Sequence, residues 1–385
     1  MSRFVRLEAI PWWNRAALAE STVLLAGVGA VGNEVLKNLA LMGVGRIVLV
    51  DRDTVAVHNL TRSVLFRAEQ AGEAKVTAAA RTLRELAPDT AVHPLKLDVA
   101  VLSPALLARA HVAVGALDSL AAQVRLGRLC RVAGIPWIQG GLGDAADLFK
   151  VTLTTHPGVE GPCLECHLPP GTGDRLLAEE LPRGGCAAAG TKAAEADGVP
   201  STPMTASILG GLMALETLSV LHAVHGLPAP DLPPAWGSYT HWSLRGPAVH
   251  ALRRRNARPG CPWHAPPRIL PVDGPVHRWS FAALAEALGN DGIVGVEGHL
   301  VRHSGCPSCG AASDWRWAAE VPARCPACDT PDPHAESLRH LPAGHPLGSR
   351  TPEALGMPPH VGLRWFTPAA EWLVTWPGLV EQALP

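Results

Sequence analysis

Five polar side chains that lie close together in the sequence could bind a nucleotide and stabilise a reacting phosphate. Within 25 residues the chain carries Asp51, Asp53, Asn59, Arg62 and Lys75. Attack on a phosphorus of ATP puts negative charge on the equatorial and leaving oxygens, and fixed Arg and Lys groups with a carboxylate-held Mg²⁺ are the usual means of stabilising it. Each charge alone would more often be a solvated surface residue, so it is the clustering that favours phosphate chemistry.

A sixth polar residue, Asp118, follows a later strand-like stretch. It lies in the segment VAVGALDSLAAQVR, shortly after the apolar run VAVG. Because the carboxyl ends of parallel strands meet at one edge of a sheet, Asp118 is expected near the residues that follow Asp51. Carboxylate oxygens are ligands that Mg²⁺ prefers, so Asp118 is predicted to hold a magnesium ion.

A glycine-rich loop precedes these residues. Gly27, Gly29 and Gly32 form GVGAVG, between an apolar strand-like run and a helical stretch. In that order of elements, backbone N–H groups at a helix N-terminus can bind phosphate; a glycine-rich turn without a ligand is the alternative. Asp51 comes 19 residues after Gly32, where an acidic side chain can accept hydrogen bonds from ribose hydroxyl groups. The loop and Asp51 also fit an NAD-dependent dehydrogenase, but hydride transfer has no need of the two cations and the amide that follow.

The cysteines indicate metal binding. Six of the nine fall in three Cys-x-x-Cys pairs, which in a cytosolic chain hold metal or do redox chemistry more often than they form disulfides. Cys306, Cys309, Cys325 and Cys328 have the spacing of a zinc ribbon, C-x₂-C-x₁₅-C-x₂-C, and predict a structural Zn²⁺. For the first pair in the chain, metal binding and redox chemistry both stay open at this point.

The elements that would position these residues alternate in type. Residues 21–150 alternate β-branched runs with helical stretches, which predicts an α/β domain with a doubly wound, Rossmann-like parallel sheet. Residues 151–205 are rich in Gly, Pro and Ala, and a long crossover loop is expected over about 170–205, before a buried helix at 206–224. Glu216 and His222 interrupt the apolar character of that helix, so it is not expected to span a membrane.

The C-terminal part has a different character. After about residue 270 the chain is rich in Trp, Pro and His around the last two cysteine pairs, so residues 269–385 are interpreted as a separate small domain and residues 1–268 as the nucleotide-binding domain. Lys and Arg number 33 against 34 Asp and Glu, and the net charge of −1 gives no general attraction to nucleic acid or to an anionic membrane. The N-terminus lacks the pattern of a secretory signal, and a cytoplasmic location is expected.

Several of these segments together resemble a known group, the ThiF/MoeB-like adenylating enzymes. They are typified by the activating enzymes of molybdopterin synthase and of the thiamine sulfur carrier, and ubiquitin-activating enzymes share their core. The resemblance covers roughly residues 1–265 and consists of GVGAVG, VDRDTVAVHNLTR, AGEAK, LDSLAAQVR, GPCLEC and ALETL. It implies an ATP- and Mg²⁺-dependent enzyme that joins AMP to the C-terminal glycine carboxylate of a ubiquitin-like or sulfur-carrier protein and releases pyrophosphate.

The resemblance also assigns roles to individual residues. It implies ribose binding by Asp51, magnesium binding by Asp118, and phosphate binding by Arg62 and Lys75, with Asn59 in the same pocket. It further implies a homodimer in which Arg6, in RFVR, reaches into the ATP site of the neighbouring subunit. Here Leu7 stands where the family usually has Gln after that arginine, and Ser119 where it usually has Asn after the metal-binding aspartate.

Five of the remaining chemical side chains are assigned in the same way. Cys163 and Cys166 match the first half of the family's structural zinc site, and Cys261 and His264 stand where its second pair would follow the late helix and strands. A Cys-x-x-His pair can complete a tetrahedral site, so a structural Zn²⁺ is expected on these four residues; a redox pair is the alternative. Cys186, in the crossover loop, lies near the sequence position at which some family members have a cysteine that carries the activated protein as a thioester or acyl persulfide.

Two other classes of function stay open. The same fold could adenylate the carboxylate of a peptide or a small molecule. It could also serve as a non-catalytic nucleotide-binding scaffold, which the presence of Asp118 and Lys75 disfavours. No rhodanese-like segment is present in the sequence, which tilts the expectation towards ubiquitin-like conjugation, with a conjugating enzyme as a further partner. The zinc ribbon would then recognise the carrier or that partner, and nucleic acid is its least favoured ligand.

Overall fold

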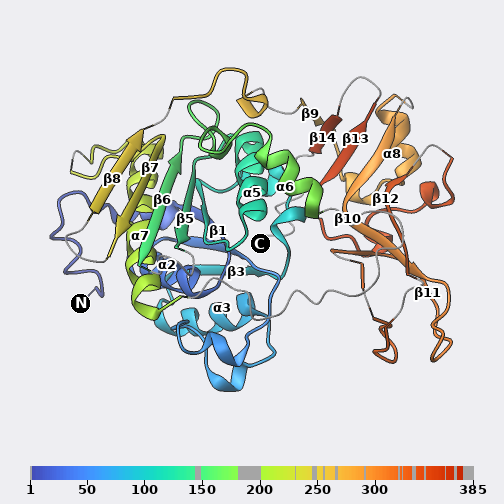
Figure 1. Cartoon of the computed structure of the whole chain (residues 1–385), viewed down its shortest axis with the longest axis horizontal. Coiled ribbons are helices and arrows are strands. Elements are labelled where there is room, and N and C mark those ends of the chain that lie inside the picture. Colours follow the sequence, from blue (N-terminus) through green and yellow to red (C-terminus); the bar gives the residue numbers. More distant parts are fainter. Residues whose placement is uncertain are drawn as a thin grey trace. The chain divides into compact units, whose positions relative to one another are not determined.

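The computed structural model of the chain describes residues 2–143, 149–180, 201–229, 231–244, 249–254, 256–264, 268–289, 292–319, 321–322, 324–331, 335–341, 344–359, 361–367 and 371–375. The chain divides into two compact units, each built around its own sheet (Figure 1). The first unit comprises residues 1–99 and 110–265, and the second comprises residues 100–109 and 266–385.

The first unit contains an eight-stranded sheet in the order β3-β2-β1-β4-β5-β6-β7-β8. The first five strands in this order, β3, β2, β1, β4 and β5, are parallel to one another. Each of the last three, β6, β7 and β8, runs antiparallel to the strand before it. The strands are β1 (Thr22–Ala26), β2 (Arg46–Val50), β3 (Ala91–Leu95), β4 (Val112–Gly115), β5 (Trp137–Leu142), β6 (Lys150–His156), β7 (Ser238–Ser243) and β8 (Val249–Arg254). The direction of the strand order reverses between β1 and β4, which is where α/β sheets bind ligands.

Helices cover both faces of this sheet, as a doubly wound fold requires. The helices of the unit are α1 (Arg15–Glu20), α2 (Ala30–Leu41), α3 (Lys75–Leu86), α5 (Leu120–Ala133), α6 (Thr172–Glu180) and α7 (Pro203–Val224). Right-handed crossovers through α2 and α3 run in one direction from β1, and the crossover through α5 runs in the other, so α2 and α3 lie on the face opposite α5. The parallel strands are covered on both sides, which explains why β1, TVLLA, is apolar and buried throughout.

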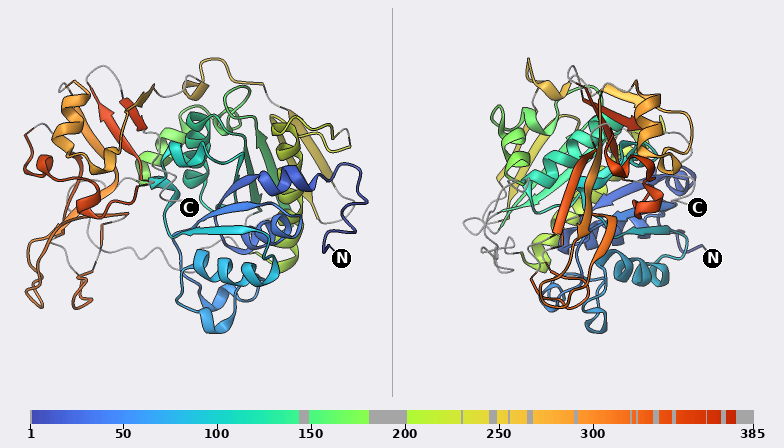
Figure 2. Two further views of the ribbon diagram at one scale, coloured as in Figure 1. Left: turned by 180° about the vertical axis from the view of Figure 1, so that it is seen from behind. Right: turned by 90° about the vertical axis from the view of Figure 1, so that its right-hand side faces the viewer.

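Helix α7 lies along α2 and against β5 (Figure 1 and Figure 2). Among the described residues it is the one helix long and apolar enough to cross a membrane, and 61% of its most apolar stretch is buried within the structure. A Cβ added to Gly210 would collide with the Cβ of Glu34 in α2, so the two helices approach closely at this glycine. Glu216 accepts hydrogen bonds from Thr155 Oγ1 at 2.9 Å and from the backbone N–H of Ala235 at 2.7 Å. These contacts make α7 a packed helix of the first unit.

The second unit contains a six-stranded sheet in which β11, β10, β13, β14 and β9 are neighbours in that order and β12 also pairs with β10. All pairs are antiparallel except β14 with β9. Its elements are α4 (Pro104–Leu107), β9 (Arg268–Pro271), α8 (Phe281–Ala287), β10 (Ile293–His303), β11 (Ser313–Ala318), β12 (Ala335–Leu341), β13 (Leu363–Phe366) and β14 (Glu371–Thr375).

Residues 100–109 leave the first sheet after β3, belong to the second unit, and return at β4. Leu102 forms a β-bridge with Val361, and the N–H of Gly362 donates to the carbonyl of Val101 at 3.4 Å. Leu102 and Val361 are both almost fully buried. The sequence interpretation assigned all of residues 1–268 to one domain and missed this segment, because its partners lie in the last part of the chain and no local pattern records them.

The amino end of the first sheet carries a pair of histidines. His111 and His225 stack with their ring centroids 5.0 Å apart, and Nδ1 of His111 accepts a hydrogen bond from the backbone N–H of Thr22 at 2.9 Å. Burial lowers the pKa of His111, and the neighbouring His225 lowers it further. The folded state therefore favours the neutral imidazole at a pH at which the unfolded chain already binds a proton.

This pair predicts a loss of stability in mild acid. Since the folded pKa of His111 is depressed, its contribution is complete above about pH 6.5, the ordinary value for histidine, and is lost as the pH falls below it. An asparagine can still accept the hydrogen bond from Thr22, so His111→Asn is expected to lose less melting temperature than the wild type between pH 7.5 and pH 5.5 in thermal scans. The exposed His58→Asn is the matched control, and an equal acid sensitivity in both variants would contradict the prediction.

Candidate functional site

The glycine-rich loop connects β1 to α2 at the carboxyl edge of the sheet. Gly27 has φ +90°, and a Cβ there would collide with the carbonyl of Ala116; a Cβ on Gly32 would collide with the carbonyl of Gly27. Gly29 is the N-cap of α2 without a side-chain cap, and a Cβ there would have nothing within 4 Å. The loop therefore needs its first and third glycines for close packing, and at the second it leaves the helix N-terminus open to a ligand such as phosphate.

Asp51 follows β2 and lies against this loop. Its two carboxylate oxygens accept hydrogen bonds from the backbone N–H of Val28 at 2.6 Å and of Asp53 at 2.8 Å. Burial raises the pKa of Asp51, while the charge of Lys75 and the two N–H groups act in the opposite direction. Each oxygen keeps a further lone pair, so the carboxylate can also accept a hydrogen bond from a ribose hydroxyl group.

Lys75 lies at the same edge, as the first residue of α3. Its ammonium group forms an ion pair with Asp53 at 2.7 Å, and its backbone N–H donates to the carbonyl of Asp53 at 3.0 Å. The side chain of Lys75 is 11% exposed and that of Asp53 is 55% exposed. The structure thus brings together Asp51, Asp53 and Lys75 beside the glycine-rich loop.

Asn59 and Arg62 make local contacts in the segment between β2 and α3. The buried Asn59 lies in the single-turn helix η1 (Val57–Asn59), and its Oδ1 accepts from the N–H of Ala56 at 2.9 Å. Arg62 Nη1 donates to the carbonyl of His58 at 3.0 Å. These bonds hold the segment that carries Arg62, and they do not by themselves direct either side chain to the glycine-rich loop.

Asp118 lies after β4, the strand next to β1. Asp118 is exposed. It lies two residues after Ala116, whose carbonyl packs against Gly27. Ser119 then caps α5 by accepting from the N–H of Ala122 at 3.4 Å. The predicted magnesium ligand therefore lies at the carboxyl edge that also carries the glycine-rich loop.

Arg6 is exposed in the N-terminal segment, which is anchored at the other end of α2. Arg3 donates to the carbonyls of Ala40 at 3.3 Å and Leu86 at 3.2 Å, near the C-terminal ends of α2 and α3. Helix α2 has 12 residues and is about 18 Å long. The anchor of the N-terminal segment is therefore far from the glycine-rich loop of its own chain. Cys186 lies outside the described residues.

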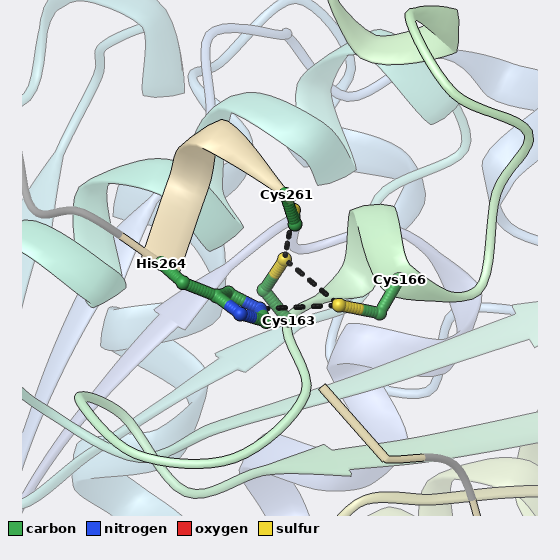
Figure 3. A group of neighbouring side chains, drawn as sticks. All are labelled: Cys163, Cys166, Cys261 and His264. Atoms are coloured by element: carbon green, nitrogen blue, oxygen red, sulfur yellow. Dashed lines mark hydrogen bonds between the residues drawn. The ribbon is translucent and has the colours of Figure 1, made fainter. Parts of the chain in front are cut away.

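A cluster of three cysteines and a histidine forms beyond β6 (Figure 3). The sulfur of Cys163 lies 3.8 Å from that of Cys166 and 3.7 Å from that of Cys261, and Nε2 of His264 lies 3.1 Å from the sulfur of Cys166. A zinc ion with Zn–S bonds of about 2.3 Å places tetrahedral sulfurs about 3.8 Å apart. The sulfur spacing therefore fits zinc, and the structure brings together two pairs that are far apart in the sequence.

The ionisation of these side chains also fits a metal. Burial and the neighbouring thiols of Cys166 and Cys261 raise the pKa of Cys163 to about 12, so a bound cation is what would let these sulfurs become thiolates together. Burial lowers the pKa of His264, which keeps its imidazole neutral, as a metal ligand must be. Four protein ligands leave no open position, so a zinc ion here would be structural.

The cluster is fixed to helix α5. Glu165, between the first two cysteines in η4 (Leu164–Cys166), accepts two hydrogen bonds from Arg128, at 2.7 Å and 2.9 Å. The guanidinium group of Arg128 also lies 3.6 Å from the centre of the ring of Trp263, which is part of η5 (Pro262–His264). Arg128 therefore joins the two halves of the cluster to each other and to α5.

The second unit contains the other cysteine cluster. Cys306 and Cys328 have their sulfurs 3.7 Å apart, and Cys309 and Cys325 have theirs 3.8 Å apart. Backbone N–H groups of Cys309 and Ser308 lower the pKa of Cys306 to about 6 and so favour its thiolate. The residues after the second cysteine of each pair, Gly310 and Asp329, both have positive φ, +71° and +56°. Two matching turns thus present four sulfurs with the spacing of a tetrahedral zinc site.

One buried residue beside the glycine-rich loop was missed by sequence reasoning. Asn33 lies in the first turn of α2, is 0% exposed, and hydrogen-bonds to the loop and to the segment that follows Arg62. The signal available in the sequence was an amide directly after the third glycine, at a position that the helical pattern turns towards the core.

A doubly wound sheet with an open glycine-rich loop and acidic and basic side chains at its switch point defines a nucleotide-binding α/β protein. The pattern of the ThiF family matches residues 1–263, and the chain belongs to that family. The family and the fold predicted from the sequence are therefore confirmed.

Proteins of known function are similar to this chain in sequence. The molybdopterin-synthase adenylyltransferase of Escherichia coli K12 is 30% identical over 231 residues, which are 59% of this chain and 83% of the relative. The SAMP-activating enzyme E1 of Haloferax volcanii is 31% identical over 180 residues, which are 44% of this chain and 63% of the relative. The chain thus spans less than two thirds of the archaeal relative and most of the bacterial one.

Solved structures share the fold. The structure of E. coli MccB with ATP superposes with a TM-score of 0.51 at 18% identity, over 68% of this chain and 74% of MccB. At that level of identity the likeness establishes the common fold alone.

Proposed function

We propose that the chain uses ATP to adenylate the C-terminal glycine carboxylate of a ubiquitin-like or sulfur-carrier protein. The observation that carries the proposal is the grouping of the glycine-rich loop, Asp51, the Lys75–Asp53 pair and Asp118 after β1, β2 and β4 at one edge of the sheet. The relatives named adenylyltransferase and activating enzyme support it. We assign the activity to residues 1–268 and a zinc ribbon to residues 306–328 of the C-terminal part, 269–385.

The reaction joins a carboxylate to AMP. ATP supplies the adenylyl group, a carboxylate oxygen of the carrier attacks the α-phosphorus, and the bond to the β-phosphate oxygen breaks to release pyrophosphate. Asp51 accepts from the ribose, and the N–H groups at the start of α2 bind phosphate oxygens. Lys75 and Arg62 neutralise the charge that develops on the leaving group, and Asp118 would hold a Mg²⁺, which would supply further charge stabilisation there.

The experiment that tests the proposal is ATP–pyrophosphate exchange with purified carriers ending in Gly-Gly. Exchange that depends on such a carrier is expected, because the adenylate forms reversibly while pyrophosphate is present. Exchange with a peptide or a small acid, and with no such carrier, would move the chain to the second class of substrate. Absence of exchange with every carboxylate would leave the non-catalytic scaffold.

A second step on Cys186 is proposed for the same reaction. The acyl adenylate is a good acyl donor and a thiolate is a good nucleophile, so transfer to the thiol would release AMP and form a thioester. A carrier adduct that reducing agent removes and that Cys186→Ala lacks is expected on non-reducing gels, and would favour conjugation. Exchange without any such adduct would leave direct delivery of the adenylate.

We also propose a homodimer in which Arg6 serves the partner's ATP site. The anchoring of the N-terminal segment at the far end of α2 supports a role in trans, because Arg6 starts far from its own glycine-rich loop. Subunits carrying Arg6→Ala and subunits carrying Asp118→Ala are each expected to be inactive, and mixing them should restore exchange, since each mixed dimer has one intact site. Failure of the mixture to recover activity, with mixed dimers confirmed by mass, would refute the trans role.

A further inference from the structure

Asn33 makes three hydrogen bonds from a fully buried position. Its Nδ2 donates to the carbonyls of Val28 at 2.9 Å and of Gly29 at 3.0 Å, and its Oδ1 accepts from the backbone N–H of Leu65 at 2.9 Å. The partners fix the orientation of the amide, because two carbonyls require a donor and an N–H requires an acceptor. The side chain of Asn33 is 0% exposed.

Val28 and Leu65, whose backbone groups bind Asn33, are each held by two hydrogen bonds. Val28 is bound through its N–H by Asp51 at 2.6 Å and through its carbonyl by Asn33. Leu65 is bound through its N–H by Asn33 and through its carbonyl by Oγ1 of Thr82, in α3, at 2.8 Å. A continuous series of hydrogen bonds therefore runs from the ribose-binding aspartate through the glycine-rich loop to helix α3.

This series connects the three elements that carry phosphate-binding groups. The glycine-rich loop presents its N–H groups, Leu65 follows Arg62 by three residues, and α3 begins with Lys75. One triphosphate must contact all three at once, so their mutual separation decides how much of each contact is realised. Groups already held at that separation bind without the cost of being reorganised.

We propose that Asn33 is a positioning residue for ATP, which fixes the glycine-rich loop relative to the segment of Arg62 and to the helix that presents Lys75. The inference rests on the proposed function for the nucleotide and for the roles of Arg62 and Lys75. The side chain of Asn33 is buried and acts on ATP only through the backbone of the glycine-rich loop and of Leu65. Its loss is therefore expected to weaken ATP binding by more than its effect on stability accounts for.

The test is the Kd of Mg²⁺–ATP, measured by calorimetry on the full chain with no carrier present. Asn33→Ala is expected to raise Kd by about tenfold or more, since two loop carbonyls and one N–H lose their partner. Asn33→Asp is expected to do at least as much, because it keeps the acceptor for Leu65 but places a carboxylate against two carbonyl oxygens. The matched control is Leu39→Ala, further along the same helix and also 0% exposed.

The Asn33 and Leu39 variants are compared when they lower the melting temperature by similar amounts. If Leu39→Ala lowers it further than Asn33→Ala does, the milder Leu39→Val takes its place. Weaker binding in both Asn33 variants and unchanged binding in the Leu39 variants would support the inference. Unchanged Kd in Asn33→Ala, or equal weakening in the Leu39 variants, would overturn it while leaving the proposed function intact. A wild type that binds no ATP would overturn the proposed function, and this inference with it.

Discussion

Replacing Asp118 with alanine is expected to lower carrier-dependent ATP–pyrophosphate exchange by about 10²- to 10³-fold, the usual effect of losing one preorganised charge contact in a transition state. Asp118 follows β4 at the edge where Ala116 packs against Gly27 of the glycine-rich loop. In the proposed mechanism Asp118 would hold a Mg²⁺ that stabilises the leaving pyrophosphate, so this variant would lose the metal ligand and keep the glycine-rich loop and Asp51.

The variant should stay folded, because Asp118 is exposed and such substitutions usually change stability by less than about 0.5 kcal/mol. Glu85→Ala, an exposed acidic residue near the end of α3, is the matched control and should retain full exchange. Asp118→Asn keeps an oxygen ligand without the charge and should require more Mg²⁺ for the same rate. Exchange at wild-type rate in Asp118→Ala, at limiting Mg²⁺, would remove this residue from the proposed mechanism.

Replacing Cys261 with serine is expected to remove one of two zinc ions and to destabilise the first unit strongly. The sulfur of Cys261 lies 3.7 Å from the sulfur of Cys163, which is 98 positions away in the sequence. A structural zinc ion contributes about 10–16 kcal/mol of apparent binding energy to folding. That is comparable with the whole stability of a typical domain, about 5–15 kcal/mol. The melting temperature should fall, and hydrogen exchange should rise first around residues 163–166 and 261–264.

Metal analysis of purified protein decides this prediction. The wild type should carry two zinc ions per chain, and Cys261→Ser and Cys309→Ser should each carry one, because the two clusters share no ligand. Cys130→Ala is the matched control: Cys130 is buried in α5 but belongs to neither cluster, so both ions should remain. Two zinc ions in Cys261→Ser would show that this cluster does not hold the metal.

Much of the candidate nucleotide site could be predicted from local sequence. The glycine-rich loop, the strand before it and the helix after it are contiguous, so the backbone geometry that phosphate needs is encoded within about a dozen residues. Asp51 and Asp118 each follow a strand of a parallel sheet, and strand ends of such a sheet share an edge whatever the details of packing. The pairing of Cys306, Cys309, Cys325 and Cys328 was equally local, because the spacing of a zinc ribbon is set by two short turns.

Three features could be predicted from the amino-acid pattern: the alternation of strands and helices, the edge of the sheet that carries the glycine-rich loop, and the acidic and basic residues expected beside that loop. The tertiary structure decided which distant groups meet: Arg128 on both Glu165 and Trp263, Asn33 between the glycine-rich loop and Leu65, and residues 100–109 within the second unit. The physical reason is that periodicity and spacing reflect hydrogen bonds and packing between near neighbours in the chain. Long-range contacts depend instead on which buried surfaces and polar groups complement one another after the chain has folded.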